Sequence, residues 1–166
     1  DDGEQCVVVG RNKNRKVTAV FAEDVTLEES GVSQDLLDCA QNDDNLYTLT
    51  TSVSTILKLV CNGNDGEFGQ TFDPAGISAL ASLTYLEISH VPLTALAPVA
   101  ELTRLETLKL VDVGLTEVSV LDQLNKATLE SLDLQQNLDV SCADVTALET
   151  LFSAETVYAP QCASGL

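Results

Sequence analysis

Apolar residues recur along the chain in a pattern that repeats several times. Segments 83–88, 105–110 and 129–134 each carry leucine or isoleucine at their first, fourth and sixth positions, and their starts lie 22 and 24 residues apart. A further step of 25 residues reaches 154–159, where smaller apolar residues occupy the same positions, and a step back of 29 residues reaches 54–59. Regular spacing of this kind is the signature of a repeat architecture. The sequence therefore predicts five units that start at residues 54, 83, 105, 129 and 154.

The spacing of the apolar positions changes inside each unit. After Leu105, apolar residues follow at 108, 110, 113, 115, 118, 121 and 124, and the same offsets hold after Leu83. A spacing of two is typical of a strand with alternate side chains buried, whereas a spacing of three indicates a tight return segment. Units stacked in parallel bury a continuous leucine column that no single unit can bury. We therefore predict an α/β solenoid with a parallel sheet and short helical or irregular return segments.

This arrangement resembles the leucine-rich repeat family, and the 22-residue units at Leu83 and Leu105 are similar to its short-repeat class, which includes bacterial internalins. Residues 93–102 are similar to the return segments of internalin repeats. The resemblance implies a sheet on the concave face of the solenoid. In the family, the ninth position of a unit normally carries Asn or Cys, whose side chain satisfies backbone groups where the strand turns. Here valines interrupt that series, because the position holds Asn62, Val91, Val113, Asn137 and Cys162.

The two ends of the chain depart from the repeat. Residues 1–53 are predicted to form an N-terminal cap, because a solenoid exposes apolar surface at its ends. Within the cap, the apolar runs 6–9 and 17–21 predict a hairpin, and 33–40 predicts a short helix with Ser33 at its N-cap. The remaining residues, 54–166, are assigned to about five repeats and a C-terminal cap.

Five cysteines indicate disulfide bonds and therefore an oxidising compartment. A Cys6–Cys39 bond would tie the predicted hairpin to the predicted helix. A Cys142–Cys162 bond would join a return segment to the strand exit of the next unit. A helix is predicted beside it over 144–152, with Val145, Leu148 and Leu151 inward. Cys61 is left unassigned, with a bond to Cys39 in place of Cys6 as one alternative. The other alternative is a cytosolic protein with five reduced, buried cysteines.

The chain begins with Asp1 and contains no methionine. Removal of a secretory signal explains this beginning, and so does a trimmed tag or a subdomain cut from a longer chain. Together with the cysteines, it leads us to expect a secreted or cell-surface protein.

Charge narrows the choice of partners. The chain has 26 Asp and Glu against 8 Lys and Arg, a formal net charge of −18. Such a field repels phosphate backbones and anionic membrane surfaces, so we expect no nucleic-acid partner. No apolar run approaches the ~18 residues of a membrane span. The basic turn at 11–16 either contacts an acidic partner, a glycan sulfate or a phosphate, or is a solvated hairpin tip.

Side chains that flank the inward leucines form the open face of the predicted sheet, where adjacent strands lie ~4.8 Å apart. The central column is Lys58, Glu87, Lys109, Asp133 and Tyr158. The columns on either side of it begin with Ile56 and with Val60. Tyrosines are favoured anchors in protein interfaces. The composition of this surface therefore predicts a protein-binding site. The alternative is that these side chains are polar only because they face solvent. The predicted site consists of Tyr85, Glu87, Ser89, Thr107, Lys109, Val111, Ser131, Asp133, Gln135 and Tyr158.

One column carries residues that could do chemistry, because Cys61, His90 and Asp112 share the eighth position of their units. Cysteine, histidine and aspartate in adjacent strands are the order needed for thiolate catalysis. However, the strand exit has no walled cleft and no oxyanion-hole element beside the cysteine. The loop over 62–74 places oxygen ligands close together, but Glu67 stands where a calcium loop needs glycine. We therefore expect no enzyme, no cofactor and no metal site.

The sequence favours a secreted or cell-surface module that recognises another protein through the face of its leucine-rich-repeat sheet, with a glycan as a second candidate partner. One alternative is an inhibitor or effector that blocks a partner enzyme through the same face. The other is a structural spacer domain of a longer surface protein. The partner itself is not specified by the sequence.

Overall fold

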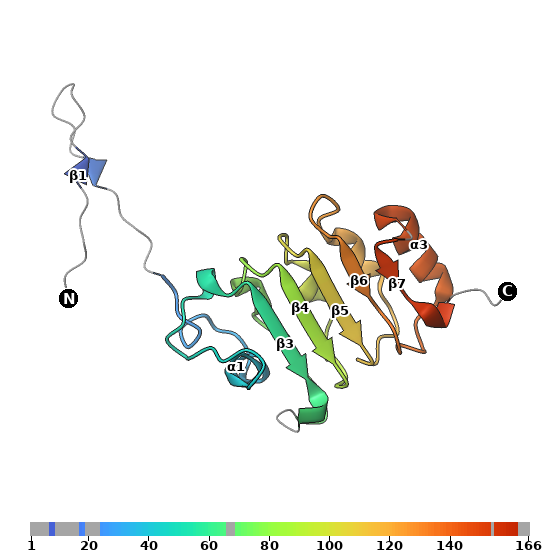
Figure 1. Ribbon diagram of the computed structural model, residues 1–166, viewed down its shortest axis with the longest axis horizontal. Helices are drawn as coiled ribbons and strands as arrows, with labels where there is room; N and C mark the ends of the chain where they lie inside the picture. The colour runs from blue at the N-terminus through green and yellow to red at the C-terminus, as the bar shows by residue number, and fades with distance from the viewer. Residues whose placement is uncertain (1–6, 9–16, 19–23, 66–68, 154, 163–166) are drawn as a thin grey trace.

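The computed structural model describes residues 7–8, 17–18, 24–65, 69–153 and 155–162. Its main feature is a sheet of five parallel strands in sequence order, each hydrogen-bonded to the next (Figure 1). The strands are β3 (Lys58–Asn62), β4 (Tyr85–Ser89), β5 (Thr107–Val111), β6 (Ser131–Asp133) and β7 (Val157–Tyr158). This arrangement confirms the predicted α/β solenoid.

Short helical segments connect the strands and lie behind the sheet in Figure 1. The connections from β4 to β7 contain α2 (Ala97–Ala100), η4 (Ser119–Gln123) and α3 (Cys142–Phe152). The longer connection from β3 to β4 contains η2 (Gly63–Asp65) and η3 (Ile77–Ala79), while η1 (Val53–Thr55) precedes the sheet and η5 (Pro160–Cys162) follows it. In the described part of the chain, no helix is long and apolar enough to cross a membrane.

The register of the last four strands agrees with the predicted spacings. Tyr85 lies opposite Thr107, which lies opposite Ser131, and Leu132 lies opposite Val157. Successive units are therefore 22, 24 and 25 residues apart, as the sequence predicts.

The start predicted for the first unit is wrong by two residues. Leu59 pairs with Leu86, so Ile56 rather than Ser54 takes the position that Leu83 occupies in the next unit. Burial explains the shift, because Ile56 is 0% exposed whereas Leu57, which the prediction placed inward, is 52% exposed. The shift is even, so the residues of β3 keep their inward and outward sides, and the change falls on Leu57, which precedes the strand.

The core is a stack of apolar side chains between the strands and the return segments. Leu86, Leu108 and Leu132 occupy matching positions in adjacent strands, and all three are fully buried. The return segments contribute further buried residues from the opposite side, among them Ile77, Val99, Val118, Leu121 and Leu148. Because each buried side chain contributes only roughly 1.5–3 kcal/mol, stability comes from the whole stack and not from one unit.

The helix predicted in the N-terminal cap is present as α1 (Gln34–Gln41), beside β3 (Figure 1). The Ser33 hydroxyl accepts a hydrogen bond from the backbone N–H of Leu36 at 3.2 Å, as expected for an N-cap. The same hydroxyl donates to the carbonyl of Asp73 at 2.5 Å, and the backbone N–H of Asp73 donates to Asp35 at 2.7 Å. The start of α1 is therefore fixed to the first return segment.

Other predicted cap elements are described in part. β1 (Val7–Val8) and β2 (Val17–Thr18) pair antiparallel, as expected for the two strands of a hairpin. Cys6 and the basic turn 11–16 lie outside the described residues. At the other end, α3 buries Val145 and Leu148 while Leu151 is half-buried, as the predicted helix over 144–152 requires.

Candidate functional site on the open face of the sheet

The open face is the side of the sheet opposite the leucine stack. In β3, β4 and β5 the side chains alternate between buried and more accessible positions, so every second residue faces outward. The predicted site residues are on these strands and on β6 and β7, and Tyr158 is the most accessible of them at 55%. Ser89 is an exception, because it is only 5% exposed and is therefore not available to a partner. The others are half-buried: Tyr85, Glu87, Thr107, Lys109, Val111, Ser131, Asp133 and Gln135.

The corrected register changes the first member of each column. Lys58 lies beside Tyr85, and Val60 lies beside Glu87. The predicted ladder in which Lys58 precedes Glu87 is therefore wrong. Instead, the central column is Val60, Glu87, Lys109, Asp133 and Tyr158.

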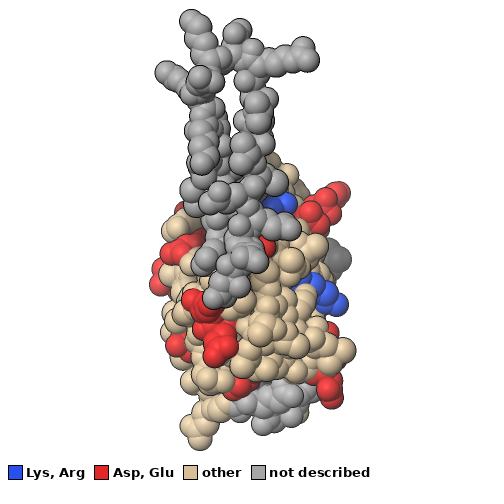
Figure 2. All heavy atoms as spheres, turned by 90° about the vertical axis from the view of Figure 1, so that its left-hand side faces the viewer, with Lys and Arg blue, Asp and Glu red and all other residues tan. Residues whose placement is uncertain are grey.

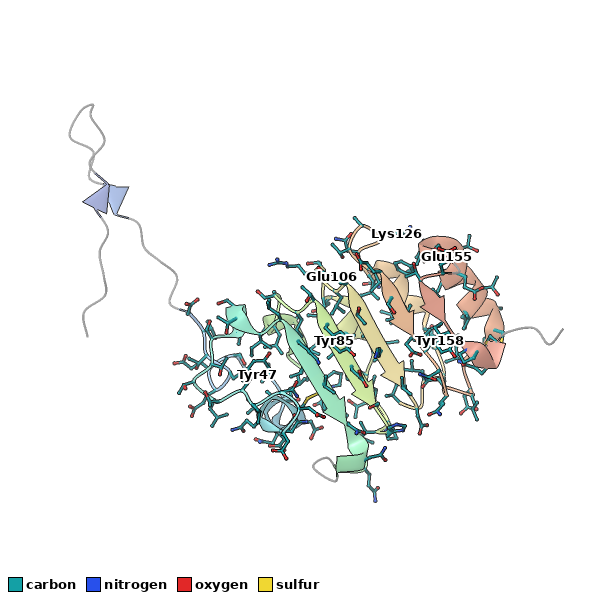
Figure 3. The ribbon with its side chains drawn as sticks, in the orientation of Figure 1. Tyr47, Tyr85, Glu106, Lys126, Glu155 and Tyr158 are labelled. Carbon is teal, nitrogen blue, oxygen red and sulfur yellow. A yellow bond between two sulfur atoms is a disulfide. The ribbon has the colours of Figure 1, made fainter. Side chains whose placement is uncertain are left out.

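Four side chains from three strands make a tyrosine–lysine cluster, defined as Lys58, Tyr85, Glu87 and Lys109. The Tyr85 hydroxyl donates to Glu87 Oε2 at 2.6 Å, and Lys109 Nζ lies 3.5 Å from the same oxygen. The ammonium groups of Lys58 and Lys109 lie 5.1 and 5.5 Å from the centre of the Tyr85 ring, within the range of cation–π interactions. Figure 3 shows Tyr85 in the middle of the open face. The cluster holds this aromatic side chain in a defined position.

The cluster also shifts two pKa values. Partial burial raises the pKa of Tyr85 above its ordinary value of 10.0, and the hydrogen bond to Glu87 adds to this effect, while Lys109 opposes it. The pKa of Lys109 is raised above 10.5, first by the Tyr85 hydroxyl and also by the charge of Glu87, against the effect of desolvation. Together the two shifts favour a neutral tyrosine beside a lysine cation.

Substitutions in the cluster should move the pKa of Tyr85 in opposite directions. Glu87→Gln should lower it, because a negative neighbour is lost, and Lys109→Met should raise it, because a positive neighbour is lost. Since the folded pKa lies above the unfolded one, the stabilisation from Tyr85 is complete below pH 10 and is lost as the pH rises through the raised pKa. The pH dependence of the tyrosine 13Cζ resonance measures the effect. An unchanged midpoint in both variants would contradict the cluster.

The C-terminal half of the open face has a different character. The side-chain amide of Gln135 donates to Asp133 at 2.9 Å, and its backbone N–H donates to the other oxygen at 3.0 Å. Tyr158 follows on β7, and Figure 3 shows Tyr47, Tyr85 and Tyr158 one after another across the molecule. The face therefore changes from lysines near β3 to an aspartate and a tyrosine near β7.

The cap contributes side chains to this surface that no pattern in the sequence indicated. The Tyr47 hydroxyl donates to the carbonyl of Lys58 at 3.0 Å. Asn45 also binds β3, accepting from the N–H of Val60 at 2.9 Å and donating to its carbonyl at 2.7 Å. These bonds occupy the edge of β3 and extend the surface beyond the repeats. The cap has no repeating pattern, so no spacing in the sequence points to these contacts.

The structure separates the cysteine from the histidine and the aspartate that the sequence placed in one column with it. Cys61 lies opposite Ile88, is 0% exposed and is disulfide-bonded, so it offers no thiolate. His90 Nδ1 lies 3.4 Å from Asp112 Oδ2, and both residues are exposed. Their φ values of 57° and 53° are left-handed, as is the 64° of Gln136, so this position serves the turn at each strand exit. Among the residues that the structure describes, no group of three potential ligands could hold a metal ion.

The disulfide predicted between Cys6 and Cys39 is wrong, because Cys39 is bonded to Cys61 with a Cα–Cα distance of 5.2 Å. Cys61 takes the inward position that Ile88 occupies in the next unit, where α1 packs against β3, so its side chain meets Cys39. The predicted Cys142–Cys162 bond is confirmed, with a Cα–Cα distance of 5.1 Å.

Comparison with known proteins identifies the fold. No family model and no curated protein sequence matches the chain. Among solved structures, internalin C2 of Listeria monocytogenes superposes with a TM-score of 0.59 over 85% of this chain and 60% of its own, at 21% identity. The chain has an internalin-like leucine-rich-repeat fold. A second internalin of that organism, inlF, gives a TM-score of 0.50 at 20% identity, over 76% of this chain and 42% of its own.

This leucine-rich-repeat chain thus spans less than two thirds of the length of the internalins that it matches. The two matches concern its solenoid architecture: parallel strands on one face and short return segments on the other. Within that architecture, no described element covers the open face where the tyrosine–lysine cluster lies (Figure 1).

Proposed function

We propose that the chain is a protein-recognition module that binds a protein partner on the open face of its leucine-rich-repeat sheet. The observation that carries the proposal is the tyrosine–lysine cluster, an ordered aromatic and charged group at the centre of a surface that no described element covers. Tyrosine is a typical interface anchor because it offers a large rigid contact area and a polar tip. The similarity of the fold to internalins supports the same function.

Charge distribution supports this choice of surface. Residues 24–166 contain 22 acidic residues and four basic ones, and two of those four, Lys58 and Lys109, belong to the cluster. Figure 2, which views the molecule from the cap end, shows acidic side chains spread over the described surface with few basic ones. The cluster therefore differs in charge from its surroundings, as a specific contact surface requires.

We further propose that the module works in an oxidising compartment, at the cell surface or after secretion, and that it is not an enzyme. Two disulfides support the location, because such bonds persist outside reducing compartments. The absence of a free thiol at Cys61 removes the catalytic arrangement that the sequence suggested.

A photo-cross-linking experiment tests the open face. A benzophenone amino acid is placed at Thr107 on β5 or, as a control, at the exposed Thr146 on α3, and the full chain is incubated with extracellular proteins of the producing cells. We expect a saturable cross-linked product from the Thr107 position and none from the Thr146 position. Products from Thr146 alone would contradict the assignment of the open face.

The double substitution Tyr85→Ala/Lys109→Ala should then reduce formation of the Thr107 product at least about tenfold, because central aromatic and cationic residues dominate binding energy. The melting temperature should stay nearly unchanged, since both side chains are on the outer side of the sheet. Lys126→Ala removes an exposed cation elsewhere and serves as the control. Unaltered capture by the double variant would reject the cluster as the contact.

A further inference from the structure

Leu46 in the N-terminal cap combines two unusual properties. Its side chain is 72% exposed, and its φ of 58° lies in the left-handed region. Glycine or asparagine normally occupies such a position after a helix, because a larger side chain is strained there. A leucine at this place stabilises neither the local turn nor the core. Strained positions of this kind are concentrated at functional sites.

Backbone and side-chain hydrogen bonds hold Leu46 in this conformation. Its N–H donates to the carbonyl of Asn42 at 2.9 Å, and the next N–H, of Tyr47, donates to Ala40 at 2.9 Å. The side chain of Asn42 accepts from the backbone N–H groups of Asp44 and Asn45 at 3.2 and 3.1 Å. These bonds fix the backbone on both sides of Leu46, so a partner that contacts its exposed side chain needs to order little of the loop.

The same loop joins the open face. Tyr47, the neighbour of Leu46, donates through its hydroxyl to the carbonyl of Lys58 at the edge of the sheet. The Lys58 side chain is exposed and its ammonium lies over the Tyr85 ring. In the described part of the chain, no carboxylate lies within 4.0 Å of that ammonium, unlike that of Lys109. Leu46 and Lys58 are thus an apolar group and a cation held by the Tyr85 ring without a carboxylate, on two adjacent elements.

We propose that the cap extends the recognition surface, with Leu46 as an apolar anchor and Lys58 as its cationic neighbour. The partner segment that fits them carries an acidic side chain next to an apolar or aromatic one. This inference rests on the proposed function of the open face and names the chemistry of its ligand. A carboxylate bound here replaces water on the exposed side of the Lys58 ammonium, while an apolar side chain covers exposed leucine surface.

The net charge of −18 does not prevent an acidic segment from binding. At physiological ionic strength the Debye length is about 8 Å, so distant carboxylates are largely screened while direct contact with Lys58 is not. Long-range repulsion acts mainly on the association rate. Binding should consequently tolerate the acidic remainder of the molecule.

A displayed library of random 12-residue peptides tests this chemistry on the full chain. Enriched peptides, resynthesised with a fluorescein label, are measured by fluorescence polarisation. We expect them to contain Asp or Glu within a few residues of Leu, Phe or Trp. Leu46→Asn and Lys58→Gln should each weaken binding about tenfold. The matched controls Leu138→Asn, at a leucine that is 81% exposed, and Lys126→Gln should stay within about twofold of the original affinity.

Stability separates an anchor from a structural residue. Asparagine tolerates the left-handed region, so Leu46→Asn should leave the melting temperature unchanged or raise it. A fall of several degrees would overturn the anchor role, and enrichment of basic peptides would overturn the proposed ligand. Peptides that need Tyr85 and Lys109 but bind equally without Leu46 and Lys58 contradict only this inference. Peptides that bind the Tyr85→Ala/Lys109→Ala variant equally well contradict the proposed function itself.

Discussion

Replacing Asn137 with alanine is expected to lower the free energy of unfolding by about 3–5 kcal/mol. This asparagine is 1% exposed and follows β6 at the ninth position of its unit. Its Oδ1 accepts from the N–H groups of Val113 and Leu115 at 3.1 and 3.2 Å. Its Nδ2 donates to the carbonyls of Leu110 and Leu134 at 2.7 and 3.0 Å. Alanine would leave the buried N–H groups of Val113 and Leu115 without their acceptor, and each such group costs roughly 1–3 kcal/mol. The Leu134 carbonyl keeps a second hydrogen bond, from Gln161 Nε2 at 3.0 Å.

Urea denaturation followed by far-ultraviolet circular dichroism measures this loss. Asn125→Ala is the matched control, because Asn125 is exposed and its side chain bonds to the carbonyl of Thr103 and the N–H of Ala127 at the surface. We expect the control to cost less than about 1 kcal/mol. An equally small loss for Asn137→Ala would mean that water can enter the site and replace the amide.

Asn137 also explains how the solenoid tolerates the interruption of its asparagine series. The sequence places Val91 and Val113 where the family normally has Asn or Cys, and both valines are buried. The N–H of Val113 is nevertheless satisfied, because Asn137 of the following unit reaches back to it. One polar side chain thus serves the backbone of two units. The repeat pattern predicted where Asn137 would lie but not which unit it would stabilise.

The strand register was predicted correctly where neighbouring units carry independent copies of the same leucine pattern. From Leu83 onward, three spacings agree with the observed register because each leucine position is confirmed by the next unit. The first unit has a neighbour on one side only, and two alignments fit it. Leu57 and Leu59 match the leucine positions if the unit starts at Ser54, whereas Ile56, Leu59 and Cys61 match them if it starts two residues later.

The structure selects the second alignment, because the packing of the cap determines which side chains of the first unit are buried. α1 packs against β3, so Cys61 is an inward residue and Leu57 is left at the surface. Tyr47 and Leu46 were missed for the same reason, because their positions depend on bonds from Asn42 and Asn45 that occur only once in the chain. Long-range contacts without a repeating pattern leave no periodic signal in a single sequence.

The Cys39–Cys61 disulfide should be worth about 2–4 kcal/mol, which is the second large effect that the structure predicts. It closes a loop with a sequence separation of 22 and joins the cap helix to the first strand of the sheet. Cys39→Ala/Cys61→Ala should therefore lower the urea midpoint markedly. The loop closed by Cys142–Cys162, with a separation of 20, is of similar size, so the entropic contribution of that bond is similar.

Access to reductant distinguishes the two bonds. Cys39 and Cys61 are 0% exposed, whereas Cys142 is exposed and Cys162 half-buried. Dithiothreitol added to the folded protein should therefore reduce Cys142–Cys162 first, and Cys39–Cys61 should follow only at the rate at which the cap separates from the sheet. Timed alkylation with mass spectrometry measures both rates, and a peptide map without reductant must show Cys39 joined to Cys61. Simultaneous reduction, or a map that joins Cys39 to Cys6, would contradict the packing of α1 against β3, because that packing is what buries the first pair.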